Sequence, residues 1–206
     1  MMTELRDIAQ LGAKVLRLHA EAVADVHSDE IRQIIAALHT TLACTQGVGI
    51  AAPQISESKQ IIIVASRPTA RYPHAPLMQP TVMINPRFQA LSEIKEKGWE
   101  GCLSIPNIRA LVPRYTAIKI HYMNEQGDEQ TAELNDFVAR VFQHEFDHLH
   151  GKVFLDSVET NQDIIAESEY LKKTDLGVGG VGSNAVIKNG YIRSSLGLGR
   201  RRWFYR

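Results

Sequence analysis

The segment FQHEFDHLHG, residues 142–151, constrains this chain more than any other stretch of its sequence. His144 and His148 lie four residues apart, with Glu145 between them. On an α-helix each residue advances by about 100°, so the two imidazoles lie about 40° apart on successive turns and can bind one ion. The spacing His-Glu-x-x-His suits a metal site in which the carboxylate acts as a base. A solvated helix face rich in histidine is the alternative, and this motif alone leaves both open.

Other side chains of the same segment have different expected positions. Asp147 lies about 60° from His144, where it either orients an imidazole or is an exposed acid. His150 lies about 240° from His144 and is expected at the surface. Val141 and Phe142 lie on the neighbouring face and are expected to bury the helix beside the site, because a working metal centre excludes water.

Three segments have the apolar periodicity of helices. Residues 136–150 are expected to form the helix that carries the two histidines. Residues 28–46 place their apolar side chains on one stripe, with Ser28 as N-cap and Gly47 after the end. Residues 161–172 are expected to form a further helix.

Four apolar or alternating runs predict β-strands, at residues 60–66, 81–86, 117–123 and 129–134. The last two flank the turn NEQGD and are expected to form a hairpin. Strands and helices segregate along the chain instead of alternating, which favours an α+β fold over a parallel α/β fold. We therefore expect antiparallel sheets packed around a central metal-binding helix at 136–150.

The composition favours a globular protein with one domain, or one domain and a tail. The chain has 206 residues, of which 44% are hydrophobic and 22% charged, and its net charge is zero. The overall charge thus gives no argument for nucleic acid or membrane binding. No apolar run approaches the roughly 18 residues of a membrane span, and the first residues lack the apolar core of a signal peptide. We expect a cytoplasmic protein with no membrane partner.

The C-terminal segment differs from the rest in composition. Residues 173–206 hold seven glycines, seven basic residues and one acid, so their charge is +7 − 1 = +6 and the first 172 residues carry −6. We expect residues 1–172 to be a single domain and residues 173–206 to be a basic, Gly-rich tail.

A third metal ligand is not evident from the histidine motif itself. Glu159 and Glu167 follow it, but neither belongs to a recognisable second motif. Upstream, WEGCLSIP contains Cys102, whose thiolate would complete a Cys-His-His set and leave the fourth position open. Cys102 and Cys44 are the only cysteines, too few for a disulfide scaffold.

Taken together, three short motifs resemble those of the peptide deformylase family. They are GVGIAAPQ at 47–54, EGCLS at 100–104 and HEFDH at 144–148, in that family's order and with similar separation. The resemblance extends over roughly residues 5–172 and does not include the basic tail. It implies a hydrolase that removes the N-formyl group from the formylmethionine of newly synthesised polypeptides and releases formate. Nascent N-formylmethionyl polypeptides would then be its partners, and residues 1–172 its catalytic domain. A basic tail on a protein that meets nascent chains suggests contact with ribosomal RNA, and a merely solvated segment is the alternative.

The resemblance also implies a role for each motif residue. Cys102, His144 and His148 would bind one divalent ion, which lowers the pKa of its water from about 15.7 toward 7. Fe²⁺ is favoured by the family and would make the enzyme sensitive to oxygen, while Zn²⁺ also suits these ligands. Glu145 would take a proton from the water and pass it to the leaving amine.

Further residues are implied in binding the substrate. The Gln54 side-chain amide and the Leu103 backbone N–H would donate to the oxygen of the formyl group as charge develops on it. The backbones of Val48, Gly49 and Gly101 would line a track on which the peptide adds as an extra strand. Additional contacts are expected at Arg109, near the exiting peptide, and at the methionine pocket, formed by Val48, Phe137, Val141 and His144 with Arg140 either at its rim or solvated.

Two other functions remain compatible with parts of the pattern. An endopeptidase with the same histidine motif would cleave a different bond. A metal-binding or ribosome-associated protein without activity would need neither a base at Glu145 nor an oxyanion donor at Gln54, and the presence of both argues against it.

Overall fold

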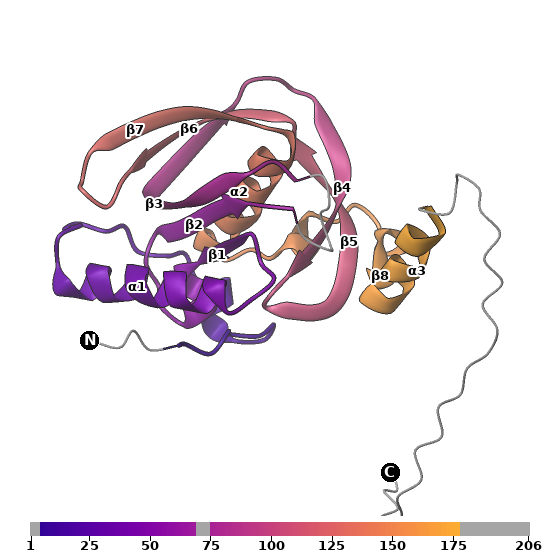
Figure 1. Cartoon of the computed structure of the whole chain (residues 1–206), viewed down its shortest axis with the longest axis horizontal. Coiled ribbons are helices and arrows are strands. Elements are labelled where there is room, and N and C mark those ends of the chain that lie inside the picture. The colour runs from indigo at the N-terminus through magenta and orange to yellow at the C-terminus, as the bar shows by residue number, and fades with distance from the viewer. Residues whose placement is uncertain (1–4, 69–74, 178–206) are drawn as a thin grey trace, which may run out of the picture.

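Two antiparallel sheets and three α-helices form the part of the chain that the computed structural model describes, residues 5–68 and 75–177 (Figure 1). The larger sheet has the order β1-β2-β3-β6-β7. The smaller sheet has the order β4-β5-β8. The strands are β1 Gly49–Ala51, β2 Ile61–Ser66, β3 Met78–Ala90, β4 Lys95–Cys102, β5 Ile105–Tyr115, β6 Ala117–Met123, β7 Glu129–Asn135 and β8 Ile164–Ala166. The helices are α1 Asp29–Ala43, α2 Asp136–Leu149 and α3 Glu167–Gly177, with short 3₁₀ helices at Lys14–Arg17, Ala52–Ile55, Phe154–Ser157 and Asn161–Asp163.

Helix α2 is the central element. It contacts β1, β2, β6 and β7 of the larger sheet and β5 of the smaller one. Phe142 and Leu149 on this helix are fully buried. The expected α+β fold, with antiparallel sheets around a central helix at 136–150, is therefore confirmed.

The larger sheet is covered on both faces, which explains the apolar run of β2. Ile61 and Ile63 pack in the cluster formed with α1, while Ile62 and Val64 pack in the cluster formed with α2. Successive side chains of a strand point to opposite faces. A strand buried on both faces therefore has no solvent-facing positions, and all six residues of β2 are buried, of which only Ser66 is polar.

Helix α1 begins as expected and ends earlier than expected. The hydroxyl of Ser28 accepts a hydrogen bond from the Ile31 N–H, as an N-cap does. The helix ends at Ala43 instead of 46, because Thr45 forms a turn: its hydroxyl donates to the Leu42 carbonyl at 2.9 Å.

The helix predicted at 161–172 begins later than expected. Residues 161–163 form a 3₁₀ helix, and β8 follows, pairing Ile164 with Ala110 of β5. The helix, α3, begins only at Glu167 and extends to Gly177. An apolar Ile-Ile-Ala run beside an open strand edge pairs with that edge in preference to starting a helix.

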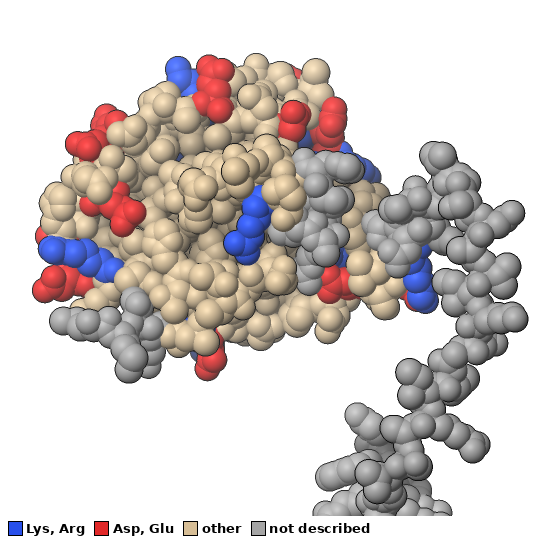
Figure 2. Space-filling model, viewed as in Figure 1, with Lys and Arg blue, Asp and Glu red and all other residues tan. Residues whose placement is uncertain are grey.

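The observed surface agrees with the balanced composition. On the face shown in Figure 2, acidic and basic side chains are interspersed around the margin, and most of the centre is uncharged. No helix that the structure describes is both long and apolar enough to cross a membrane. The predicted basic tail falls almost wholly on residues 178–206, outside the described residues, and α3 crosses its expected boundary at 173.

Candidate metal centre

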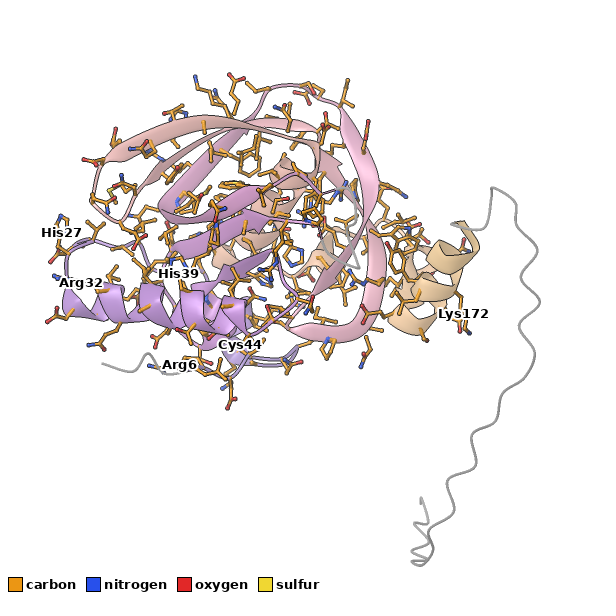
Figure 3. The ribbon with its side chains drawn as sticks, in the orientation of Figure 1. Arg6, His27, Arg32, His39, Cys44 and Lys172 are labelled. Atoms are coloured by element: carbon orange, nitrogen blue, oxygen red, sulfur yellow. The ribbon has the colours of Figure 1, made fainter. Side chains whose placement is uncertain are left out.

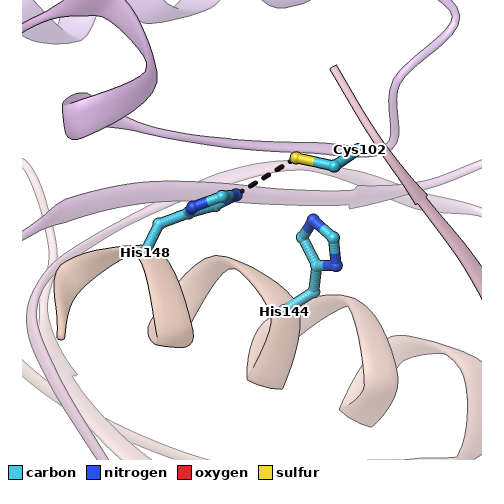
Figure 4. Close-up of side chains that lie close together, drawn as sticks. All are labelled: Cys102, His144 and His148. Atoms are coloured by element: carbon cyan, nitrogen blue, oxygen red, sulfur yellow. Dashed lines mark hydrogen bonds between the residues drawn. The ribbon is translucent and has the colours of Figure 1, made fainter. Parts of the chain in front are cut away.

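Cys102, His144 and His148 come together from two distant parts of the chain. Cys102 ends β4, and both histidines project from α2 toward it (Figure 4). One sulfur or nitrogen atom from each of the three lies within 4.8 Å of the others. The Cys102 Sγ and His148 Nε2 are 3.3 Å apart. A sulfur and two imidazole nitrogens are the donor set of a tetrahedral site with one open position, so the residues present fit a metal ion.

A buried carboxylate fixes the orientation of the His144 ring. The Nδ1 of His144 lies 2.9 Å from Oε2 of Glu100. Burial raises the pKa of Glu100, but the hydrogen bond from His144 and the charge of Arg114 outweigh it and lower that pKa to about 2. Glu100 is therefore ionised and accepts the Nδ1 proton, which leaves Nε2 of His144 free to bind an ion.

The cysteine has the character of a ligand. Burial raises the pKa of the Cys102 thiol, but electrostatic interaction and hydrogen bonding with the imidazoles of His148 and His144 outweigh it and bring the pKa well below its usual value. The backbone N–H of Ser104 also donates to Sγ, at 3.4 Å. A thiolate is the form that binds a metal.

Glu145 lies beside the three candidate ligands and is almost completely buried, with 4% of its surface exposed. Its Oε2 has no hydrogen-bond partner among the described residues. Burial raises the pKa of Glu145 to about 7. Gly49 of β1 faces this carboxylate so closely that an added Cβ would lie 2.4 Å from Oε1. The histidine helix therefore holds a carboxylate that can gain or lose a proton near neutral pH.

Gln54 is held with its amide group toward the cysteine. Its Oε1 accepts from the Ala51 N–H at 2.9 Å, and its Nε2 donates to Ser104 Oγ at 3.2 Å and lies 3.5 Å from Cys102 Sγ. The side chain is buried, with 1% of its surface exposed, so it is not the surface glutamine that Pro53 alone suggests. Leu103 lies next to it along the wall of the cavity.

A cavity of about 60 Å³ is lined by two of the candidate ligands, Cys102 and His144, and by Glu145. Such a volume holds several waters or a short side chain. Most of the residues expected to bind substrate line it: Val48, Gly49, Gly101, Phe137, Val141 and His144, together with Arg140 and Trp99.

Arg109 is placed differently from the other expected substrate contacts. It does not line this cavity, and only 2% of its surface is exposed. Its Nη2 donates to Glu167 of α3 at 2.8 Å, and its guanidinium lies 5.5 Å from the centre of the Tyr170 ring. It also packs on Gly101, where an added Cβ would lie 2.5 Å from Nη1. Arg109 instead lines a second, neighbouring pocket together with Gly101 and Leu103.

Asp147 of α2 and His150, which caps the end of that helix, have partners that the sequence did not reveal. Asp147 accepts from Arg114 at 2.6 Å and contacts no imidazole directly, although Arg114 in turn holds Glu100. His150 points away from the candidate ligands, as expected, but is partly buried, with its ring 4.7 Å from that of His19. The exposed Cys44 caps the end of α1 and takes no part in the site (Figure 3).

Glu100, Ser104 and Arg114 are site residues that sequence reasoning missed. Glu100 and Ser104 are both in the EGCLS motif. Glu100 lies two residues before Cys102 and Ser104 two residues after it, and this proximity could have identified them as site residues. Arg114 lies twelve residues beyond Cys102 and opposite Glu96 in the pairing of β4 with β5, and its side chain extends from there to Glu100.

The fold and this donor set define a metal-binding hydrolase, with a cysteine and a His-Glu-x-x-His helix around one open position. The model of the family described as Polypeptide deformylase matches residues 5–163. The chain belongs to this family. It is therefore a hydrolase that removes the formyl group from the N-terminal formylmethionine of new polypeptides, as the motifs implied, and its family uses a metal ion.

Individual relatives agree with the family assignment. The chain is 52% identical over 170 residues to peptide deformylase 2 of Nostoc sp., covering 82% of this chain and 95% of that protein. It is 44% identical over 149 residues to peptide deformylase 2 of Shewanella oneidensis, covering 72% and 82%. The Met-Ala-Ser-bound crystal structure of class I type b peptide deformylase from Acinetobacter baumannii superimposes with a TM-score of 0.74 at 41% identity, covering 76% of this chain and 100% of that one.

Proposed function

We propose that Cys102, His144 and His148 are the ligands of one divalent ion, with Fe²⁺ favoured over Zn²⁺. The convergence of their donor atoms within 4.8 Å, beside a buried carboxylate with an unpartnered oxygen, is the observation that carries this proposal. Sulfur and imidazole ligands suit both metals, so availability decides between them as much as affinity. When bound, the ion polarises the formyl group and makes water nucleophilic at neutral pH.

Glu145 is the base and acid of the reaction in this proposal. Its Oε2 takes a proton from the attacking water and then delivers that proton to the nitrogen of the leaving methionine. A pKa of about 7 suits both steps, because each form of the carboxyl group is present near neutral pH. Burial serves this role, since it excludes bulk water from the proton transfer.

The Nε2–H of Gln54 and the backbone N–H of Leu103 are the proposed donors to the formyl oxygen. The bond from Ala51 to Gln54 Oε1 fixes which end of the amide points to the site. Donors held in place before the reaction stabilise the developing charge without reorganising. Loss of one such donor typically lowers turnover by about 10²–10³-fold.

The proposed substrate track runs along β1 and the end of β4. Val48, Gly49 and Gly101 would offer backbone groups to the peptide, and the methionine side chain would enter the cavity between Phe137 and Val141. The Acinetobacter relative binds Met-Ala-Ser, which supports a peptide that begins with methionine as the ligand of this site. The role of Arg109 in this proposal is to support the track from behind Gly101.

A formate-release assay tests the function. The holoenzyme is incubated with formyl-Met-Ala-Ser and, in parallel, with casein. Release of formate without cleavage of casein is the expected result, and the reverse would indicate an endopeptidase. Glu145→Gln should retain the metal and lose nearly all turnover, whereas Glu133→Gln, on an exposed position of β7, is the matched control.

The identity of the metal is tested separately. Purification without oxygen, followed by elemental analysis, should yield one iron per chain. Exposure to air should then inactivate the enzyme, and reloading with Zn²⁺ should give a form that air does not inactivate. A protein that keeps full activity in air with iron bound would contradict the assignment of Fe²⁺.

We further propose residues 1–172 as the catalytic domain of a cytoplasmic enzyme and the basic segment after it as a contact to ribosomal RNA. Residues 178–206 hold six basic residues and no acid, which supports attraction to a polyanion. Deletion of 178–206 should reduce co-sedimentation with ribosomes at low salt and leave formate release intact. Unchanged co-sedimentation would rule the contact out.

A further inference from the structure

Arg140 on α2 makes contacts that the proposed mechanism does not use. Its guanidinium donates to three backbone carbonyls, those of Glu96 at 2.6 Å, Val112 at 2.7 Å and Gly98 at 3.4 Å. It also donates to Oε1 of Glu100 at 3.0 Å. One side chain thus ties the histidine helix to β4 and to β5, the two strands that precede and follow the Cys102 turn.

The Glu100 carboxylate accepts four hydrogen bonds, and Arg140 supplies one of them. Oε1 accepts from Arg114 Nε at 2.9 Å and from Arg140 Nη1. Oε2 accepts from Arg114 Nη2 at 3.1 Å and lies 2.9 Å from His144 Nδ1. Each oxygen therefore has two partners, which fixes the carboxylate against rotation. Its position in turn sets the direction in which the His144 ring points.

The charges of this group alternate and cancel. Asp147, Arg114, Glu100 and Arg140 follow one another with charges −1, +1, −1 and +1, which sum to zero. Without Arg140 the group keeps a net charge of −1 beside His144. An unbalanced charge among buried groups is unfavourable and is relieved by movement or by entry of water.

Gly98 provides the space that the guanidinium needs. A Cβ at this position would lie 2.7 Å from Cζ of Arg140 and 2.8 Å from its Nε and Nη2. Gly98 lies within β4, opposite Val112. Because the three nearest atoms all belong to Arg140, alanine at this position would act first on its guanidinium.

We propose that Arg140 is a positioning residue for the metal centre. Its guanidinium fits beside Gly98, which has no side chain, and fixes the Glu100 carboxylate and thereby the imidazole of His144. Arg140 also lines the cavity, as does Phe137. This inference rests on the proposed role of His144 as a ligand. It assigns Arg140 no contact with the reacting atoms.

The test measures metal binding independently of turnover. Co²⁺ is loaded into the parent, Arg140→Met, Arg140→Lys and Gly98→Ala, and its visible absorption spectrum and its rate of release to a chelator are recorded. Loss of a partner that orients a ligand typically weakens metal binding by about 10–100-fold, so Arg140→Met should release Co²⁺ faster by about that factor, with an altered spectrum. Arg140→Lys should recover part of the difference, because it keeps the charge but not the paired donors.

Gly98→Ala should change the spectrum and the release rate in the same direction as Arg140→Met. In the Arg140→Met background it should add little, because the flexible methionine yields to the new methyl group. Arg32→Met, on the exposed surface of α1 (Figure 3), is the control that should match the parent. In Arg140→Met, kcat for formyl-Met-Ala-Ser should fall by a larger factor than KM rises.

The outcomes separate the inference from the proposed function. If Arg140→Met lowers the melting temperature but leaves the Co²⁺ spectrum and release rate at the parent's values, Arg140 only stabilises the fold and the inference is wrong. If the release rates differ as expected but the parent releases no formate, the inference holds and the proposed function fails.

Discussion

Substitution of Gly49 by alanine should displace the proposed base without removing any catalytic group. A Cβ on Gly49 would lie 2.4 Å from Oε1 of Glu145 and 2.9 Å from its Cδ and Cγ. Because three atoms of the side chain meet the new methyl group, rotation of the carboxylate alone does not relieve the contact. β1 is held by β2 behind it, so Glu145 has to move.

The size of the effect follows from the distance. The Glu145 carboxylate has to shift by about 1 Å to lengthen the Cβ–Oε1 distance from 2.4 Å to an ordinary contact of 3.4 Å. A misplacement of about 1 Å can lower the rate of an enzyme by about 10²-fold. Complete loss of a positioned acid or base lowers it by about 10²–10⁴-fold. We therefore expect Gly49→Ala to reduce kcat by about 10²-fold, with the metal retained.

The assay is formate release from formyl-Met-Ala-Ser, together with metal content and thermal unfolding of each variant. Gly47→Ala, two residues before β1, is the comparison. There an added Cβ would lie 3.1 Å from Thr45 Oγ1 and 3.2 Å from Leu103 Cδ1, both at the ends of movable side chains. Its loss of kcat should be much smaller than that of Gly49→Ala.

A double variant distinguishes displacement of the base from obstruction of the peptide track. In the Glu145→Ala background, both the base and the steric conflict are absent, so Gly49→Ala should have little further effect on the residual rate. A second loss of about 10²-fold in that background would refute the reasoning. Gly49 would then act through the substrate and not through Glu145.

Other substitutions give further tests. In the metal-free protein the folded-state pKa of Glu145, about 7, exceeds its ordinary value of 4.5, so stability falls as pH rises from 4.5 to 7 and stays low above 7. Glu145→Gln should thus stabilise it by up to about 3 kcal/mol at pH 8 and have no effect below pH 4.5, as measured by urea unfolding. Glu100 has the opposite shift, to about 2, so Glu100→Gln should destabilise by about 3 kcal/mol at pH 7, and the difference should vanish as pH falls from 4.5 to 2. Cys102→Ala should bind Zn²⁺ at least about 10-fold more weakly in a chelator competition. Loss of a residue that merely orients a ligand already weakens metal binding by about 10–100-fold, and Cys102 is a proposed ligand itself. Tyr170→Ala should raise KM for formyl tripeptides more than for formylmethionine amide, because Tyr170 supports Arg109 behind the track; equal changes would contradict this.

The sequence predicted the histidine pair and the central helix because both depend on local spacing. His144 and His148 share a face of any helix that contains them. The third ligand has no such local signal. Cys102 lies 42 positions before His144, so the evidence for it was the ligand chemistry of a thiolate in WEGCLSIP, strengthened by the resemblance of three motifs taken together.

The strands of the smaller sheet could not be predicted from periodicity. β4 reads KEKGWEGC and β5 reads IPNIRALVPRY, so glycine, proline and charged residues interrupt every alternating run. Two of these glycines leave space for arginine side chains at the site: the guanidinium of Arg140 lies against Gly98, and that of Arg109 lies against Gly101. A pattern that breaks the local rules for strands thus occurs where the strand serves the functional centre.

The two buried carboxylates of the site illustrate why function could not be assigned from residue type. Glu100 and Glu145 are both almost fully buried, so desolvation raises the pKa of each. Glu100 meets two arginines and the imidazole of His144, and its pKa falls to about 2. Glu145 has an oxygen without a partner among the described residues, and its pKa rises to about 7. When two carboxyl groups of one site have such different pKa values, they can take different roles in the reaction. The first carboxylate stays charged and orients a ligand, while the second can exchange a proton at neutral pH, and only the arrangement of β4, β5 and α2 determines which is which.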